Sequence, residues 1–197
     1  CNFGKLVAES DVTIIGCSGC THELFDHSYV KQANTKNLII MQETCVTVTW
    51  MKFITQVLLL CGDACLVDEI EKSIYNALLG SINTEHSDAL AGFVFDSYSP
   101  LLMATRARQL GGTQRMRNDT EVYGCCVAIG AAGTGHIPSI AVMGRRDGVA
   151  VNLYEKGEYS AVTPTGAKLK LVFDTEYPYD GKISVAVLPA KPERFTI

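Results

Sequence analysis

The chain lacks an excess of basic residues: its 197 residues include 17 lysines and arginines against 21 aspartates and glutamates, a net charge of −4. No basic stripe runs along the sequence, which argues against a nucleic-acid-binding protein or a polybasic membrane-surface protein. Long apolar runs are also missing. The longest, residues 57–61, is far shorter than the roughly 18 residues of a membrane span. With 47% hydrophobic and 19% charged residues, the chain can bury a core and is not intrinsically disordered.

A signal peptide is missing too. The first residue is Cys1 rather than Met, and the segment that follows has neither a charged region nor an apolar region of the kind that directs secretion. The last residues, from Pro192 to Ile197, resemble the start of a strand that then stops. We therefore expect the chain to be a segment of a longer protein.

Cysteine is present but sparse for a disulfide scaffold, at about 4% of the chain. Adjacent cysteines such as Cys125 and Cys126 cannot bond to each other without strain. In a chain without a secretion signal, metal binding or catalysis is the better first hypothesis for clustered cysteines. The eight cysteines lie at positions 1, 17, 20, 45, 61, 65, 125 and 126.

Helical patterns dominate residues 43–144. From Glu43 to about residue 60, apolar residues recur at spacings of three and four, as on the buried face of an amphipathic helix. Gly62 is a candidate C-cap for this helix, and Asp63 is a candidate N-cap for a second helix that runs to about Leu79. Two such helices joined by a tight turn form an αα-hairpin, the unit of helical barrels and solenoids.

The pattern changes after the second helix. Glycines and Pro138 within residues 129–142 predict a tight loop that leads into a short helix. From Asp147 the apolar period becomes two, which is typical of antiparallel strands. We therefore expect a domain boundary between residues 1–146 and 147–197, with strands near residues 149–154, 168–173 and 182–187.

Four residues form a candidate metal site. Glu43 and Cys45 stand two apart at a predicted helix start, and Cys125 and Cys126 are adjacent. A carboxylate and three thiolates are all ligand types that zinc accepts. The alternative is that Cys45 and one of the adjacent pair are simply small buried residues, as free cysteines often are.

Other cysteines allow a different site. Cys17 and Cys20 have the C-x-x-C spacing of half a zinc knuckle or a redox pair, and together with Cys125 and Cys126 they could form an all-cysteine zinc site. Cys61 and Cys65 straddle the predicted helical turn, and we expect them to pack in the core.

Glu23 is a candidate general acid. It lies beside apolar residues in an irregular segment, where hydrophobic surroundings can raise the pKa of a carboxylic acid. A solvated surface glutamate is the alternative. The histidines show no metal-binding spacing, so we expect them to be surface or hydrogen-bonding residues; they are His22, His27, His86 and His136.

Taken together, these motifs resemble glycoside hydrolase family 127, the β-L-arabinofuranosidases and their relatives. The family pattern has a Gly-Glu-Ala-Phe-like segment, a Glu-Thr-Cys helix start, a Cys-Cys pair, a Val-Asn-Leu-Tyr strand and a Tyr-Pro-Trp-Asp-Gly-like turn. The matching segments follow in the same order in this chain: Glu23–Phe25, Glu43–Cys45, Cys125–Cys126, Gly148–Tyr154 and Tyr177–Lys182.

The resemblance implies an α+β multidomain fold. Residues 1–146 would form the C-terminal part of an (α/α)6-barrel catalytic domain, and residues 147–197 would supply the first antiparallel strands of a β-sandwich domain. The implied activity is that of a retaining glycoside hydrolase acting on a β-L-arabinofuranoside or a similar furanoside.

The resemblance also implies roles for individual residues. Zinc would be held by Glu43, Cys45, Cys125 and Cys126, with Cys125 as the nucleophile. Glu23 would be the general acid/base. Tyr98 roughly matches a substrate-contacting aromatic residue. The chain departs from the family pattern after the cysteine pair, where Val127–Gly130 stand in place of Pro-x-Asn.

The main hypothesis is therefore a zinc-thiolate glycoside hydrolase with a carbohydrate partner and no nucleic-acid or membrane partner. A homodimer is an open expectation. A thiolate nucleophile without a visible export signal fits the reducing cytoplasm. The alternatives are a non-catalytic carbohydrate-binding or structural module that keeps a zinc site, and the all-cysteine zinc protein.

Overall fold

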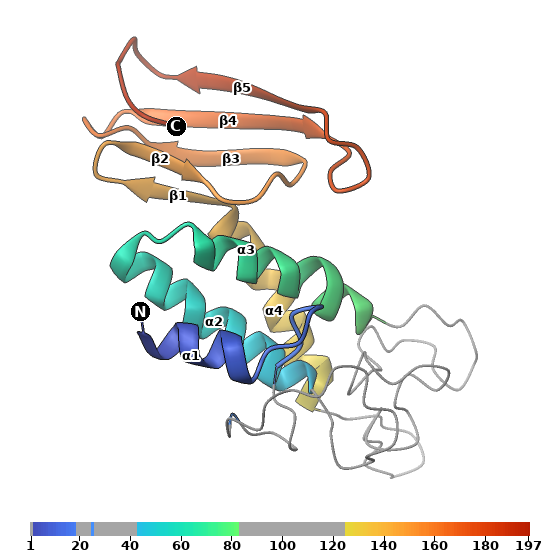
Figure 1. The fold of residues 1–197 in the computed structure, drawn as a ribbon. Coiled ribbons are helices and arrows are strands. Elements are labelled where there is room, and N and C mark those ends of the chain that lie inside the picture. The colour runs from blue at the N-terminus through green and yellow to red at the C-terminus, as the bar shows by residue number, and fades with distance from the viewer. Residues whose placement is uncertain (1, 19–24, 26–42, 83–124) are drawn as a thin grey trace. The chain divides into compact units, whose positions relative to one another are not determined.

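The computed structural model describes residues 2–18, 25, 43–82 and 125–197. The chain divides into two compact units, residues 1–135 and 136–197. The described part of the first unit is helical, and the second unit is built mainly from antiparallel strands (Figure 1). The expected combination of helices with antiparallel strands in an α+β protein is therefore confirmed.

The first unit holds the predicted αα-hairpin. Its elements are α1 (Asn2–Ser10), α2 (Thr44–Cys61), α3 (Cys65–Lys72), the π-helix η1 (Ser73–Leu78) and the first part of α4 (Cys125–Ala141). Between α2 and α3, Gly62 adopts φ +63° and its N–H donates to the carbonyl of Leu58 at 2.7 Å, which confirms the predicted C-cap. The Asp63 carboxylate accepts a hydrogen bond from the Cys65 N–H at 3.1 Å.

Helix α2 supplies much of the core of the first unit. Trp50, Met51 and Ile54 are fully buried on it, and Ile70 and Ile74 of the α3–η1 stretch are buried as well. By length and composition alone, α2 could also cross a membrane, yet 56% of it is buried inside the protein. This burial is what a core helix of a packed helical unit shows.

The prediction for residues 129–142 is wrong. In place of a loop and a short helix, α4 runs without interruption from Cys125 to Ala141, with Pro138 inside it. Proline inside a helix removes one hydrogen bond and its ring clashes with the preceding turn, but Pro138 stands in the last turn of α4. The small residues serve close packing: a Cβ on Gly133 would lie 2.6 Å from Cγ2 of Val48 on α2. Glycine at this position therefore lets α4 approach α2 closely.

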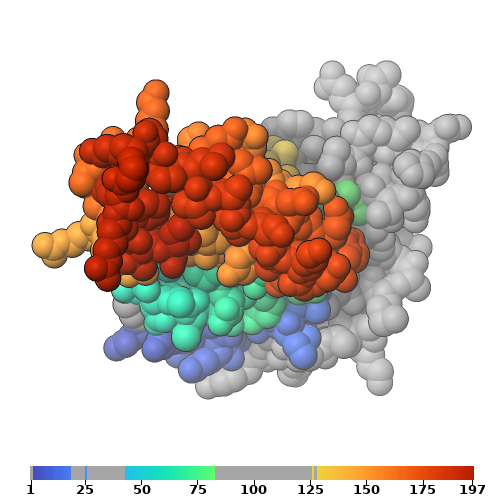
Figure 2. Space-filling model, turned by 90° about the horizontal axis from the view of Figure 1, so that it is seen from above, coloured from blue at the N-terminus to red at the C-terminus, as the bar shows by residue number. Residues whose placement is uncertain are grey.

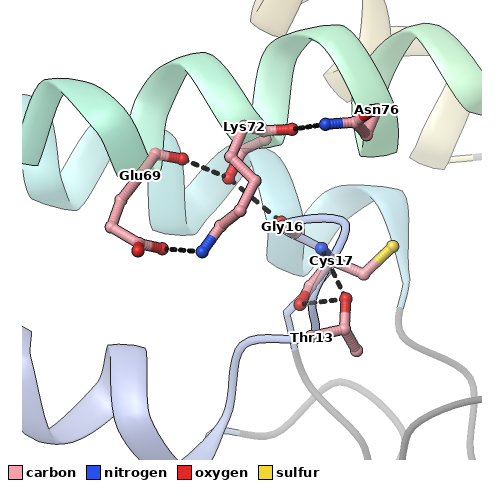
Figure 3. A network of polar contacts seen from close by, with 7 residues as sticks. Thr13, Gly16, Cys17, Glu69, Lys72 and Asn76 are labelled. Atoms are coloured by element: carbon pink, nitrogen blue, oxygen red, sulfur yellow. Dashed lines mark hydrogen bonds and ion pairs between the residues drawn. The ribbon is translucent and has the colours of Figure 1, made fainter.

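A loop over residues 11–18 is held against the α3–η1 stretch (Figure 3). Val12 and Ser18 form an isolated antiparallel bridge that closes the loop. The Ser73 hydroxyl donates to the Gly16 carbonyl at 3.0 Å, and the Cys17 N–H donates to the Thr13 hydroxyl at 3.0 Å. Gly16 has φ +81°, and a Cβ there would lie 2.6 Å from Cα of Ser73, so only glycine fits.

The second unit contains two antiparallel sheets. One pairs β1 (Val142–Arg145) with β2 (Gly148–Val151), and the other has the order β3-β4-β5, formed by β3 (Gly157–Val162), β4 (Lys168–Thr175) and β5 (Ile183–Pro189). The predicted strands correspond to β2, β4 and β5, whereas β1 and β3 were not expected. The chain end also joins this unit, because Val149 N–H donates to the Thr196 carbonyl at 3.0 Å.

Exposed and buried residues alternate along β4, and the buried ones form the core of the second unit. Leu169, Leu171 and Phe173 point to one buried face and pack with Val149. Leu171 stands opposite Tyr159 of β3 and Val187 of β5. Residues of β5 are more exposed than those of β4, and Figure 2 shows the C-terminal strands in orange and red at the surface.

Candidate metal centre

The candidate metal centre begins at the N-terminus of α2. Glu43 is the N-cap residue of this helix, in an extended conformation with φ −68° and ψ 143°, and is only 1% exposed. Cys45 follows in the first turn. Because the backbone is extended at Glu43 and helical from Thr44, the side chains at 43 and 45 are not forced onto opposite faces. Both can therefore reach the same point.

The first turn of α4 brings the third ligand. Cys126 Sγ lies 3.6 Å from Cys45 Sγ and 3.6 Å from Glu43 Oε1. The three candidate ligand atoms all lie within 4.8 Å of one another. Cys126 is 81 positions from Cys45 and 83 from Glu43 in the sequence, so the fold, rather than local spacing, brings it to the other two.

The two separations that involve Cys126 fit a tetrahedral zinc ion. With Zn–S bonds of about 2.3 Å and Zn–O bonds of about 2.0 Å, ligand atoms around a tetrahedron stand about 3.5–3.8 Å apart. The observed separations of 3.6 Å agree with this geometry. Two cysteines and one glutamate are also the donor types that zinc accepts. Cys125 is adjacent to Cys126 in the first turn of α4, but its side chain lies outside the described residues.

Two helix N-termini contribute to this centre. Glu43 and Cys45 stand at the start of α2, and Cys126 stands at the start of α4. The positive end of a helix dipole and its unpaired N–H groups favour anionic side chains nearby. Two such termini partly offset the repulsion that a carboxylate and thiolates would otherwise exert on one another. A divalent cation would offset the remainder.

The start of α2 is also tied to the loop over residues 11–18. The Thr47 N–H donates to the Glu43 carbonyl at 3.0 Å, and the Thr47 hydroxyl accepts a hydrogen bond from the Ser18 N–H at 3.1 Å. Both Thr47 and Ser18 are buried. Ser18, five residues before Glu23, is therefore fixed to the helix that carries two of the candidate metal ligands. No motif or spacing in the sequence pointed to Thr47.

The remaining predicted site residues fall into two groups. Glu23, Tyr98 and Cys20 lie outside the described residues. Cys17 is buried, and burial raises the pKa of its thiol to about 12, against a smaller lowering by the Thr13 hydroxyl. Such a thiol is neutral at physiological pH in the absence of a metal ion. Within residues 2–18, 43–82 and 125–197, the ligand atoms that lie close enough together to share a metal ion belong to Glu43, Cys45 and Cys126, and Cys17 is not part of this group.

Two further expectations concern residues away from the cluster. Cys61 and Cys65, expected in the core, are exposed free thiols at the turn between α2 and α3, so that prediction is wrong. The turn itself is at the surface, and Gly62 rather than a cysteine determines its geometry. His136 shares a hydrogen bond of 3.1 Å with the Ser139 hydroxyl, as expected of a hydrogen-bonding histidine. The other histidines lie outside the described residues.

The described residues form a helical unit with a candidate metal site. In this site a buried carboxylate and two thiols, from two separate helix starts, lie close enough together to bind one ion. The family model described as "Beta-L-arabinofuranosidase, GH127 catalytic domain" matches residues 2–138. This match covers more than half of the chain, and the chain therefore belongs to that glycoside hydrolase family. The family predicted from the motifs is confirmed.

Solved structures support the same fold. A GH127 β-L-arabinofuranosidase from Geobacillus stearothermophilus T6 superimposes with a TM-score of 0.57 at 18% identity, covering 93% of this chain and 28% of its own. The GH127 β-arabinofuranosidase BT3674 gives a TM-score of 0.55 at 19% identity, covering 92% of this chain and 26% of its own. A third structure, described as a glycoside hydrolase, gives 0.55 at 17% identity, with coverages of 96% and 33%.

The chain thus spans about a quarter to a third of the length of the solved structures that it resembles. A search among curated proteins found no significant match. At these identities, the structural likeness establishes the fold, while substrate and mechanism are matters for proposal.

Proposed function

We propose that the chain is part of a retaining β-L-arabinofuranosidase-type glycoside hydrolase whose nucleophile is a zinc-bound cysteine. The observation that carries the proposal is the cluster of Glu43, Cys45 and Cys126 inside the matched catalytic domain. The match between their separations and a tetrahedral zinc site supports the choice of metal. Residues 1–146 would contribute to an (α/α)6 barrel, and residues 147–197 would begin a β-sandwich.

The ligands of the proposed centre are Glu43, Cys45, Cys125 and Cys126. When bound, zinc would keep the cysteine sulfurs as thiolates at neutral pH. Cys125 Sγ attacks the anomeric carbon of the furanoside, and the bond from that carbon to the leaving oxygen breaks. Glu23 donates its proton to the leaving oxygen, so the aglycone departs as a neutral alcohol.

The second half of the reaction returns the enzyme to its starting state. Glu23, now a carboxylate, takes a proton from a water molecule, and the resulting hydroxide attacks the anomeric carbon. The carbon–sulfur bond breaks and Cys125 leaves as a thiolate. Two inversions at the same carbon give net retention, as in glycosidases with a carboxylate nucleophile. Tyr98 would contact the sugar in both steps.

One buried hydrogen bond supports the proposed pairing of Glu23 with the cluster. The cluster stands at the beginning of α2, and the Thr47–Ser18 hydrogen bond ties the same helix turn to the segment before Glu23. An acid/base and a nucleophile must lie on either side of the scissile bond within narrow limits. The buried hydrogen bond anchors Ser18, five residues before Glu23, to the helix that begins at the cluster.

Metal analysis by mass spectrometry of the purified chain tests the metal centre directly. One zinc ion per chain is expected for the wild type and for Cys61→Ser, an exposed cysteine at the far end of the same helix. Cys45→Ser should lose the metal, whereas Cys17→Ser should keep it. Zinc retained in Cys45→Ser but lost in Cys17→Ser would favour the all-cysteine site and refute the proposed centre.

Covalent trapping tests the catalytic role. A thiol-reactive β-L-arabinofuranoside probe should label Cys125 in the full hydrolase, and intact-mass and peptide analysis would locate the adduct. Cys61→Ser should label like the wild type. Zinc binding without any labelling of Cys125 would favour the alternative, in which the cluster serves only as a structural centre of a non-catalytic module.

A further inference from the structure

Thr47 uses its hydroxyl differently from Thr49 and Thr55 of the same helix. Those two threonines donate to carbonyls four residues back in α2, at 2.8 and 2.7 Å, as threonines inside helices commonly do. The Thr47 hydroxyl instead accepts a hydrogen bond from the Ser18 N–H, 29 positions away in the sequence. This bond links the start of α2 to the loop over residues 11–18.

The loop holds the Ser18 N–H in a fixed place. The bridge between Val12 and Ser18 closes the loop. The Ser73 hydroxyl donates to the Gly16 carbonyl at 3.0 Å and so attaches the loop to η1 (Figure 3). Ser18 and Thr47 are 0% and 1% exposed, so the bond between them is shielded from water. All of these residues belong to the first unit.

Thr47 is also connected to the turn that carries two of the candidate ligands. Its N–H donates to the Glu43 carbonyl at 3.0 Å, which closes the first turn of α2 around Cys45. The Glu43 side chain does not cap the helix, and the first turn of a helix frays readily. The bond from the Ser18 N–H therefore holds this turn from outside the helix.

The start of α2 is thus held from two directions. At the next residue, Val48, helix α4 approaches closely, because a Cβ on Gly133 would lie 2.6 Å from Val48 Cγ2. Apolar packing has no preferred direction, whereas a hydrogen bond weakens steeply when its angle changes. The bond to Thr47 therefore restricts rotation of α2 about its own axis. Such a rotation would move Cys45 relative to Cys126.

We propose that Thr47 is a positioning residue of the metal centre. Its bond to the Ser18 N–H keeps the first turn of α2, and the two ligands on it, at the separation from Cys126 that one ion requires. A site binds a metal more tightly when its ligands are already in place, because binding does not then have to order them. Groups that orient ligands without touching the metal change its affinity by roughly 10- to 100-fold. The choice of zinc as the ion rests on the proposed function.

Zinc titration of the full chain, in competition with a chromophoric chelator, tests this role. Thr47→Val removes the acceptor but keeps the size and branching of the side chain, and should bind zinc about tenfold more weakly than the wild type. Thr47→Ser keeps the hydroxyl and should retain the wild-type affinity. Thr55→Val is the matched control and should also bind like the wild type, because Thr55 is buried on α2 but bonds within its own helix.

Tryptophan fluorescence checks that each variant is folded before zinc is added, since Trp50 is fully buried in α2. The check matters because an unfolded fraction would by itself lower the apparent affinity for zinc. If Thr47→Val does not fold, Thr47→Ala removes the same acceptor with a better helix former, and the same loss of affinity is expected.

The outcomes separate this inference from the proposed function. A folded wild type that binds no zinc would refute the metal centre and the positioning role together. A wild type that binds zinc, with unchanged affinity in Thr47→Val, would overturn the positioning role alone. An equal loss in Thr55→Val, or an equal loss in Thr47→Ser, would overturn it as well, because the hydrogen bond from the Ser18 N–H would not be the cause.

Discussion

Gly16→Ala should destabilise the first unit by about 2–5 kcal/mol, because two separate costs meet at this position. The left-handed φ of +81° costs an alanine about 1–2 kcal/mol. A Cβ would also lie 2.6 Å from Cα and 2.7 Å from N of Ser73. Because the obstacle is helix backbone, the loop would have to move away from η1, and overpacking of this kind costs about 1–3 kcal/mol.

The matched control is Gly62→Ala. Gly62 is also left-handed, with φ +63°, but no heavy atom lies within 4 Å of the position that its Cβ would take. We expect it to lose only the conformational cost, about 1–2 kcal/mol. Both glycines belong to the first unit, so the same probe reports on both. The difference between the two variants therefore isolates the contact with Ser73.

Urea unfolding followed by tryptophan fluorescence measures this difference. Trp50 is the single tryptophan of the chain and is fully buried in α2, so its emission reports on the first unit. Gly16→Ala should lower the unfolding free energy by at least about 1 kcal/mol more than Gly62→Ala does. Equal losses in the two variants would refute the reasoning, because they would show that the loop moves away from Ser73 without appreciable cost.

Two further predictions follow from side-chain contacts in the two units. In chelator-treated protein, oxidised glutathione should form a Cys45–Cys126 disulfide, because the two sulfurs already lie 3.6 Å apart; peptide mapping should find it, and added zinc should prevent it. In the strand unit, a hydrogen bond from the Thr163 hydroxyl lowers the pKa of Glu193 below 4.5. The resulting stabilisation is present above pH 4.5 and is lost as the pH falls through the lowered pKa. Thermal unfolding of Glu193→Gln, followed by circular dichroism, should depend less on pH in this range; an unchanged pH dependence would contradict the assignment.

Local patterns predicted the elements that bury a regular apolar face. The helix from Glu43 and the strand β4 both carry large apolar residues at the period of their structure, and both were found where expected. Helix α1 gave no such signal, because its buried face consists of the small residues Gly4, Val7 and Ser10 while Phe3 and Leu6 are exposed.

Glycine and proline account for the error at α4. Both residues lower intrinsic helix propensity, so the sequence of residues 129–142 predicted a loop. Tertiary packing reversed that preference, because Gly133 allows a close approach to Val48 that no larger residue permits. The same close approach holds α4 beside α2, and the two helices bring Cys126 to Cys45. Gly133, one of the residues that obscured the helix, is therefore part of what assembles the candidate metal cluster.

The candidate metal site shows what sequence can and cannot supply. The residue types at Glu43, Cys45 and Cys126 were enough to suggest zinc, since a carboxylate and thiolates are ligand types that zinc accepts. Spacing could not show that they meet, because a separation of more than eighty residues sets no distance between them. Thr47 gave no signal at all, since its role depends on a backbone N–H donated from Ser18. A side chain that binds a backbone group leaves no trace in residue types, so positioning residues of this kind emerge only from the folded chain.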